Sequence, residues 1–408
     1  RCAVGNMRDY NIEEEGIMDS REWEYSRVYA QIDLDAVTAN LEQIGLRTGP
    51  GAKVLAVVKC DGYGHGSVPI ARAIEDMETV GGYATATAEE AVELRQAGIR
   101  KPILILGYTF PYAYEELIRR EVRMTVFRED TLEQLERAAK HVGAKAIVHV
   151  KVDTGMGRVG IQPREENLDF LQRIADSDDL ELEGIFTHFA KADERDLGYT
   201  LEQMKRFGQF VTMAEARLGK RIPCCHAANS AGIVRMKEAH LDLVRAGIIL
   251  YGLYPSEEMA GEAQWLRPAL SLHSHLVYVK EVEPGQSISY GGTFTAKERM
   301  RVGTVPVGYG DGYPRSLSGK GSVLIRGRRA AILGRVCMDQ LMVDLSALPE
   351  AAEGDPVVLL GRDGREEITA QELGNLSGRF NYELMCDLSP RVPRVYLRNG
   401  QLLDRTRS

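Results

Sequence analysis

The chain has 408 residues, enough for two domains, and its 44% hydrophobic and 27% charged residues are ordinary for a soluble globular protein. A formal net charge of −8 argues against nucleic acid or an anionic membrane surface as the main partner. The six cysteines have no CxxC spacing and predict reduced thiols in a cytoplasmic protein, and no apolar run approaches the roughly 20 residues that span a bilayer.

The N-terminal segment, residues 1–27, is acidic and has no apolar core of the kind found in signal peptides. We expect it to be a poorly ordered or peripheral tail. The chain starts with Arg1 rather than methionine, which is consistent with a processed product or a fragment of a longer protein. The strand-like residues 28–34 that follow can pair with either of the two domains described next.

From residue 53 to about residue 251, short apolar strands alternate with amphipathic helices. The predicted strands are residues 53–58, 82–85, 102–107, 123–127, 146–152, 182–187, 222–226 and 241–247, and the predicted helices include 88–97, 131–141, 166–175 and 201–218. Eight strands with helical crossovers predict a (β/α)8 barrel that occupies residues 28–265. A doubly wound sheet is the alternative, because periodicity alone does not show that the sheet closes.

Residues 266–408 have a different pattern, dominated by strand-like runs with glycine-rich turns. The predicted strands are residues 272–283, 301–307, 322–325, 330–335, 340–345 and 356–360. This composition predicts a smaller, mainly β C-terminal domain.

Lys59 stands where the first predicted barrel strand ends, and the glycine-rich segment 60–66 follows it at once. Burial lowers the pKa of a lysine because it disfavours the charged form. A neutral lysine amine is the nucleophile that forms a Schiff base with a carbonyl compound or with pyridoxal phosphate. The structural alternative is a lysine that merely extends to solvent from a strand end.

Lys59 belongs to a set of polar residues that stand at or just after the C-terminal ends of the predicted barrel strands. In a (β/α)8 barrel the C-terminal strand ends form the active site, so these side chains are expected to converge. They are Lys59, Lys151, Asp153, Arg158, His188, His226, Asn229, Ser230 and Arg245. Any single one is more simply explained as a structural polar residue, but the complete set favours a functional site.

An anion site is expected after the last two barrel strands, where barrels of this kind commonly bind phosphate. Asn229 and Ser230 open a helical turn, and Gly247 and Ile248 follow the last strand. Together they supply a hydroxyl and backbone amides, and Tyr63 in the glycine-rich segment can add a phenol donor.

The segment 155–160 matches the GxGxxG pattern of dinucleotide-binding turns. In those turns a helix begins directly after the glycines. Here Pro163 follows closely and delays any helix, so the sequence disfavours a nicotinamide site. No metal site is predicted.

Taken together, these motifs resemble those of the alanine racemase family, the fold-type III enzymes that depend on pyridoxal phosphate. The resemblance runs from about residue 29 to residue 403. Its motifs include AVVKCDGYGHG at 56–66, VKVDTGMGRVG at 150–160, HAANSAG at 226–232, SISYGGTF at 287–294 and RVPR at 391–394.

The resemblance implies two catalytic bases: Lys59, which binds pyridoxal 5'-phosphate and acts on the D-enantiomer, and Tyr290, which acts on the L-enantiomer. It implies further cofactor contacts by Tyr63, Arg158, His188, Ser230, Arg245, Gly247 and Ile248, and the predicted anion site adds Asn229 to these cofactor-binding residues. Arg245 would face the pyridine nitrogen, and His188 would bond to Arg245. Substrate contacts are implied for Arg158 and Met338, and Lys151 matches a position that is often carbamylated.

In this family Tyr290 comes from the partner subunit, so the resemblance also implies a cytoplasmic homodimer with shared active sites. Its reaction would interconvert L- and D-alanine and supply D-alanine for peptidoglycan. One residue departs from the family pattern: Pro390 occupies a position that frequently carries a tyrosine above the cofactor phosphate. That departure predicts a roomier side-chain pocket with measurable turnover of serine.

Three alternatives are weaker. The nearest is a racemase for serine or for a broad set of amino acids. A fold-type III decarboxylase would share the barrel and the lysine, but the chain has no GGG phosphate loop and no evident catalytic cysteine motif. A non-catalytic pyridoxal phosphate carrier would need no second base, and a β domain that carries Tyr290 argues against it.

Overall fold

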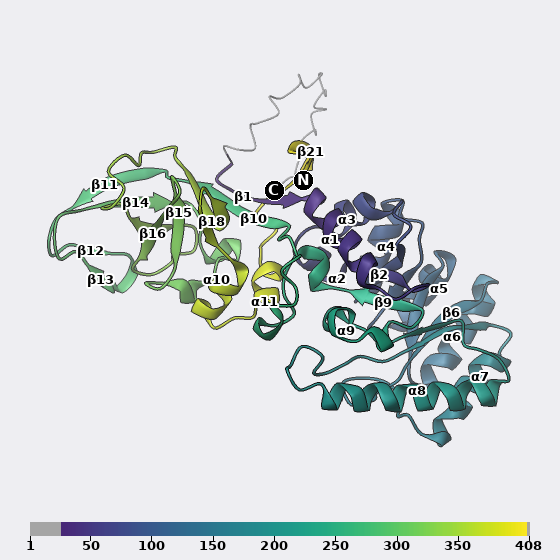
Figure 1. The fold of residues 1–408 in the computed structure, drawn as a ribbon. Helices are drawn as coiled ribbons and strands as arrows, with labels where there is room; N and C mark the ends of the chain where they lie inside the picture. The colour runs from purple at the N-terminus through teal and green to yellow at the C-terminus, as the bar shows by residue number, and fades with distance from the viewer. Residues whose placement is uncertain (1–25, 406–408) are drawn as a thin grey trace, which may run out of the picture.

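The computed structural model describes residues 26–405 (Figure 1). The predicted acidic tail, residues 1–27, therefore lies almost entirely outside the described residues. Within the described part, no helix combines the length and the apolar character needed to cross a bilayer.

Eight parallel strands form a closed barrel in chain order, which confirms the predicted (β/α)8 architecture and excludes the doubly wound sheet. The first strand pairs with both the second and the last, so the sheet has no free edge. The strands are β2 (Lys53–Val57), β3 (Val80–Thr85), β4 (Ile103–Ile105), β5 (Val122–Val126), β6 (Ala146–Lys151), β7 (Leu180–Phe186), β8 (Cys224–His226) and β9 (Leu243–Ala246).

Helices surround the barrel, and the sequence specifies several of their ends. Asp33 caps the first helix by accepting from the amides of Asp35 and Ala36. Thr87 and Glu90 form a capping box at the start of α4. The helices are α1 (Leu34–Arg47), α2 (Lys59–Tyr63), α3 (Ser67–Ile74), α4 (Ala88–Gln96), α5 (Tyr114–Arg119), α6 (Glu129–Val142), α7 (Leu168–Asp176), α8 (Gly198–Leu218) and α9 (Ser230–Arg235).

The C-terminal part is mainly β, with an 11-stranded sheet and a separate two-stranded hairpin. β1 (Val28–Asp33) belongs to this sheet: it runs antiparallel to β10 and parallel to β20. The other strands are β10 (Leu270–His275), β11 (Tyr278–Val282), β12 (Ser287–Ile288), β13 (Phe294–Thr295), β14 (Met300–Val305), β15 (Ser322–Ile325), β16 (Arg328–Leu333), β17 (Leu341–Asp344), β18 (Pro356–Asp363), β19 (Glu366–Ile368), β20 (Arg394–Arg398) and β21 (Gln401–Arg405).

Several features of this part differ from the sequence prediction, and five of its strands, β12, β13, β19, β20 and β21, were not predicted. The run 272–283 forms two strands, because the chain turns at Leu276 and Val277, whose amides bond to Asp355 and Thr304 instead of continuing one ladder. Two short helices, α10 (Ala370–Ser377) and α11 (Asn381–Cys386), were not predicted. Figure 1 places α11 beside α2, at the mouth of the barrel.

Candidate active site

The segment after β2 forms a left-handed helical turn, which fixes the position of Lys59. Cys60, Asp61, Gly62 and Tyr63 have φ values of 54°, 49°, 60° and 53°. Three of these residues are not glycine, and the left-handed conformation costs such residues roughly 1–2 kcal/mol each. Strain of this kind persists only where the surroundings enforce it, and it is typical of functional sites.

Hydrogen bonds and close packing enforce the turn. The amide of Cys60 donates to the Glu90 carboxylate at 2.6 Å, and the amide of Ser67 donates to the Asp61 carboxylate at 2.8 Å. On the far side, a Cβ atom on Gly64 would overlap the carbonyl oxygen of Met385 in α11. The C-terminal domain therefore packs directly against the turn that carries Lys59.

Lys59 lies at a cavity of about 310 Å³ at the C-terminal ends of the barrel strands, together with Tyr63, His188, Ser230 and Arg245. Burial, followed by the charge of Arg158, lowers the pKa of the Lys59 amine. Each of these effects favours the neutral amine, which is the form that acts as a nucleophile or a base.

A cradle of polar groups that suits an anion lies on the same cavity, formed by Tyr63, Ser230 and Gly247. The Gly247 amide donates to Ser230 Oγ at 3.0 Å. A Cβ atom on Gly247 would stand 2.9 Å from the Tyr63 phenol oxygen and 3.5 Å from Ser230 Oγ, so this space exists because residue 247 is a glycine. Asn229 holds the cradle in place by accepting from the Gly232 amide, and Ile248 lines the same cavity.

Arg245 is the buried cation of the site, with 3% of its surface exposed. Its guanidinium donates to His226 Nδ1 at 2.9 Å, to the Thr187 carbonyl at 2.8 Å and to His188 Nδ1 at 3.3 Å. Burial, followed by Arg158, lowers the pKa of Arg245 to about 9. Burial and the charge of Arg245 also hold the pKa of His188 well below its usual value, so His188 is neutral and accepts from the arginine.

Lys151 and Arg158 are close enough to couple electrostatically, although their exposure differs. Lys151 is buried, and its amine donates to the Val152 carbonyl at 2.8 Å. Burial, followed by Arg245, lowers its pKa to about 7. Arg158 is exposed on the glycine loop 155–160.

That glycine loop does not open a helix. Asp153 accepts from the amides of Gly155 and Gly157, and Ile161 then pairs back with Val152. The loop therefore lacks the helix N-terminus that a dinucleotide-binding turn places at the pyrophosphate, which agrees with the sequence argument against a nicotinamide site.

Two predicted site residues do not line this cavity in the same chain. Tyr290 is 69% exposed and Met338 is 52% exposed. Tyr290 lies between β12 and β13, and Figure 1 shows that this hairpin is at the end of the C-terminal domain remote from the barrel. Within one chain, Lys59 and Tyr290 do not share a site.

Sequence reasoning missed two aromatic residues that line the cavity, Phe380 and Tyr382. The Tyr382 ring lies 6.1 Å from the Tyr63 ring in an edge-on arrangement and 4.3 Å from the Phe380 ring. No local signal identifies them, because their position depends on how α11 packs onto the barrel. Pro390, by contrast, is exposed and is not among the cavity-lining residues.

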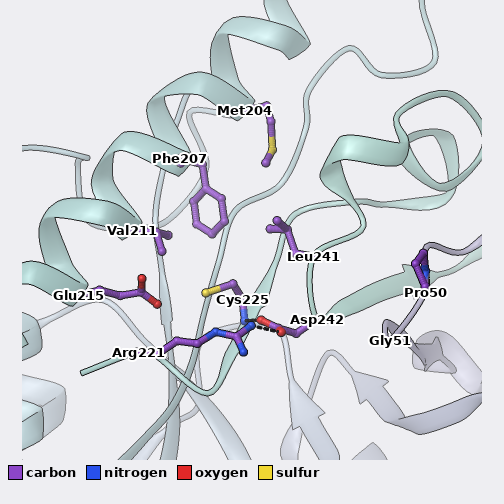
Figure 2. A pocket seen from close by; sticks show the side chains of 11 residues that line it. Pro50, Gly51, Met204, Phe207, Val211, Glu215, Arg221, Cys225, Leu241 and Asp242 are labelled. Atoms are coloured by element: carbon purple, nitrogen blue, oxygen red, sulfur yellow. Dashed lines mark hydrogen bonds and ion pairs between the residues drawn. The ribbon is translucent and has the colours of Figure 1, made fainter.

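A larger cavity, about 590 Å³, lies elsewhere, between α8 and the start of β9 (Figure 2). Its walls combine apolar side chains such as Phe207 with Glu215, Arg221 and Asp242. These polar groups are already paired: Arg221 binds Asp242, and Glu215 accepts from the Ile222 amide. The geometry therefore favours the smaller cavity, where polar groups converge, as the active site.

The fold and this site define a barrel enzyme whose cavity brings together a half-buried lysine, a buried arginine and polar groups suited to an anion. Solved structures with the same architecture include alanine racemase from Clostridium difficile 630, with a TM-score of 0.88 and 39% identity over 93% of this chain and 98% of that one. Alanine racemase from Bacillus anthracis with bound L-Ala-P gives a TM-score of 0.87 and 37% identity over 94% and 98% of the two chains.

Family profiles agree with the structural comparison. The alanine racemase N-terminal domain matches residues 32–255, and the alanine racemase C-terminal domain matches residues 269–396. The alanine racemase of Halothermothrix orenii is 44% identical over 90% of this chain and 96% of its own length. That of Desulforamulus reducens is 45% identical over 91% and 99%. The chain belongs to the alanine racemase family.

Proposed function

We propose that this protein is a pyridoxal 5'-phosphate-dependent racemase that interconverts L- and D-alanine and supplies D-alanine for peptidoglycan. The observation that carries the proposal is the arrangement of Lys59, the cradle at Gly247 and the buried Arg245 around one cavity. The Bacillus anthracis relative, an alanine racemase, binds L-Ala-P.

The residues present fit this cofactor. Tyr63, Ser230, Gly247 and Ile248 would hold its phosphate in the space that a side chain at residue 247 would fill. Asn229 acts one step behind them, by fixing the backbone of the cradle. When bound, the cofactor supplies a carbonyl that Lys59 can attack and a conjugated ring that acidifies the substrate Cα proton.

Arg245 would face the pyridine nitrogen. Even with its pKa lowered to about 9, its guanidinium stays charged and donating near neutral pH. Because arginine does not transfer its proton near neutral pH, Arg245 would leave the pyridine nitrogen unprotonated. An unprotonated ring nitrogen would favour racemisation over transamination. His188 accepts from Arg245 and thereby helps to hold its orientation.

Racemisation requires a base on each face of the substrate Cα. Lys59 serves one face, and its lowered pKa keeps a fraction of its amine neutral. Tyr290 would serve the other face, with Arg158 and the backbone of Met338 binding the substrate carboxylate. A carbamate on Lys151 would position Arg158, and the lowered pKa of Lys151 supports this because carbon dioxide adds only to a neutral amine.

Because the hairpin that carries Tyr290 lies far from the barrel of its own chain, and Met338 does not line the cavity at Lys59, we infer a homodimer in which each subunit completes the other's site. The separation in Figure 1 between α2, which begins at Lys59, and the β12–β13 hairpin, which carries Tyr290, supports this arrangement. We also infer a cytoplasmic location, in keeping with an acidic chain whose cysteines have no disulfide framework.

The proposal is tested by treating the purified protein with borohydride and mapping the modified peptide. We expect an absorbance band of bound cofactor, reduction at Lys59 and racemisation of alanine. Cofactor fixed to a different lysine, or an active protein without cofactor, would contradict the proposal.

A further inference from the structure

A line of polar side chains crosses the interior of the barrel from the active site toward its opposite end. Arg245 donates to His226 Nδ1 at 2.9 Å, and His226 Nε2 lies 3.0 Å from His149 Nδ1. His149 Nε2 lies 2.8 Å from Glu183 Oε2, and Arg123 donates to the same carboxylate from Nε and from its terminal nitrogen. We call these five residues the barrel relay.

The direction of each hydrogen bond between Arg245 and Glu183 follows from the chemistry of these two residues, because Arg245 can only donate and the Glu183 carboxylate can only accept. Arginine has no acceptor, so His226 Nδ1 must be unprotonated to receive the Arg245 donor. A neutral His226 then carries its proton on Nε2 and donates to His149. His149 in turn carries its proton on Nε2 and donates to Glu183, which as a carboxylate only accepts.

Burial and charge are consistent with this single pattern. His226 is fully buried, and burial followed by the charge of Arg245 holds its pKa well below the usual value, so it stays neutral. Burial opposes the ionisation of Glu183, but hydrogen bonds from His149 and Arg123 outweigh it and hold the pKa of Glu183 at about 2. The two histidines of the relay therefore lie between a fixed cation, Arg245, and a fixed anion, Glu183.

We propose that His149 and Glu183 are positioning residues for Arg245, because they force His226 to present an acceptor that fixes the direction of the guanidinium. This deepens the proposed function and rests on it, since Arg245 matters most if it faces a pyridine nitrogen. Without His149 and Glu183, His226 can adopt the other neutral tautomer, which carries its proton on Nδ1. Two donors, this N–H and the Arg245 guanidinium, would then face each other. The guanidinium would have to turn away from its present position.

A metal site is the competing interpretation of the same cluster. The ligand atoms of His149, Cys224 and His226 lie within 4.8 Å of one another, a grouping that suits a soft divalent cation. A metal would require an unprotonated Nε2 on His226, but Arg245 already occupies the lone pair of Nδ1. A neutral imidazole cannot offer both nitrogens, so the contact with Arg245 favours the relay over a metal ion.

The end of the relay remote from Arg245 lines a third cavity, so residues there can be substituted without changing the active-site cavity. This cavity, about 260 Å³, lies at the N-terminal ends of the strands and is lined by Arg123, His149, Glu183 and Cys224. Cys224 contributes to the wall without a hydrogen bond in the relay, so Cys224→Ala is a matched control that alters the same region.

The test compares His149→Leu with His149→Gln in the holoenzyme. Leucine cannot accept from His226, whereas the amide of glutamine can accept from His226 and donate to Glu183. We expect His149→Leu to lower kcat/KM by about ten- to hundredfold, the range that a hydrogen bond to a charged group contributes. It should also raise the fraction of turnovers that end in transamination, which is followed by cofactor absorbance. His149→Gln and Cys224→Ala should stay close to the wild type.

A readout independent of activity is the 15N spectrum of histidine-labelled protein, in which the chain has only eight histidines. We expect neutral Nε2–H tautomers for His149 and His226 in the wild type, and loss of that state for His226 in His149→Leu. A protonated Nδ1 on His226 in the wild type would overturn the proposal. Equal kinetics and equal 15N spectra for His149→Leu and His149→Gln would also overturn it. Stoichiometric zinc binding that Cys224→Ala abolishes would also overturn it, in favour of the metal site.

The two proposals fail in different ways. A wild-type protein without cofactor or racemase activity would refute the proposed function, while the histidine tautomers would still report on the relay. If His149→Leu does not fold, Glu183→Gln replaces it: this variant removes the anion that holds the proton pattern, and it should shift the tautomers toward a mixture. An unchanged tautomer pattern in folded Glu183→Gln would count against the relay.

Discussion

The left-handed turn that carries Lys59 can be tested through Gly64, the residue that ends it. Gly64 has φ 79° and ψ 1°, a conformation that costs an L-residue roughly 1–2 kcal/mol. In Gly64→Ala the new Cβ would also overlap the Met385 carbonyl, and forcing an extra methyl group into a packed region typically costs about 1–3 kcal/mol. The variant should therefore lose about 2–5 kcal/mol of unfolding free energy.

Gly143 provides the matched control. It ends α6 with φ 76° and ψ 26°, and no atom lies within 4 Å of the position that its Cβ would take. Gly143→Ala should therefore cost only the conformational component, roughly 1–2 kcal/mol. The difference in unfolding free energy between Gly64→Ala and Gly143→Ala measures the contribution of the contact between the Lys59 turn and α11.

The assays are urea unfolding and alanine racemisation. Because a shift of about 1 Å in a catalytic group can cost about a hundredfold in rate, we expect kcat/KM to fall by that order in Gly64→Ala and to stay near the wild-type value in Gly143→Ala. Equal loss of unfolding free energy in the two variants, with activity unchanged in Gly64→Ala, would refute the conclusion that the C-terminal domain braces this turn.

Three further predictions concern the bases, Lys151 and the side-chain pocket. Mixing inactive Lys59→Ala with inactive Tyr290→Phe should restore some activity through heterodimers; none after verified subunit exchange would exclude a shared site. In protein freed of carbon dioxide Lys151 is an amine without a carbamate, and its pKa of about 7 in the folded state means that the unfolded chain binds more protons between about pH 7 and 10.5. Unfolding free energy should thus rise with pH across that window, and it should rise less in Lys151→Met. Phe380→Ala should improve kcat/KM for serine relative to alanine by about tenfold, whereas Pro390→Tyr, at an exposed position, should change this ratio less. The reverse ranking would restore Pro390 as the determinant of specificity.

Most of the barrel was predictable because its signals are local. A continuous apolar strand such as β2 is typical of a parallel sheet buried on both faces, and each strand is followed by a helix that returns the chain. Given a barrel, the position of Lys59 and Arg245 at strand ends follows from topology alone. The sequence therefore predicted that Lys59, His188, Ser230 and Arg245 converge, and they line one cavity.

The remaining parts of the site were not predictable because they depend on contacts between distant segments. The left-handed turn includes Cys60 and Tyr63, which have no local preference for that conformation, and hydrogen bonds together with packing against α11 enforce it. His149 and Glu183 lie within strands, where an isolated polar residue is usually structural, and only the barrel geometry brings them into hydrogen-bond contact. Phe380 and Tyr382 reach the cavity through the packing of a short helix that the sequence did not reveal.

The C-terminal domain has two separate features, one at each end, that a barrel alone would lack. At one end it braces the Lys59 turn of its own chain: Met385 contacts Gly64, and Arg394 donates to the Gly64 carbonyl at 3.1 Å. At the other end it presents Tyr290, exposed and remote from that turn. In the proposed homodimer, the C-terminal domain of each subunit positions Lys59 of its own chain and places its Tyr290 in the active site of the partner subunit. Loosening this domain should therefore damage both half-reactions, whereas substituting Tyr290 should mainly damage proton removal from the L-enantiomer.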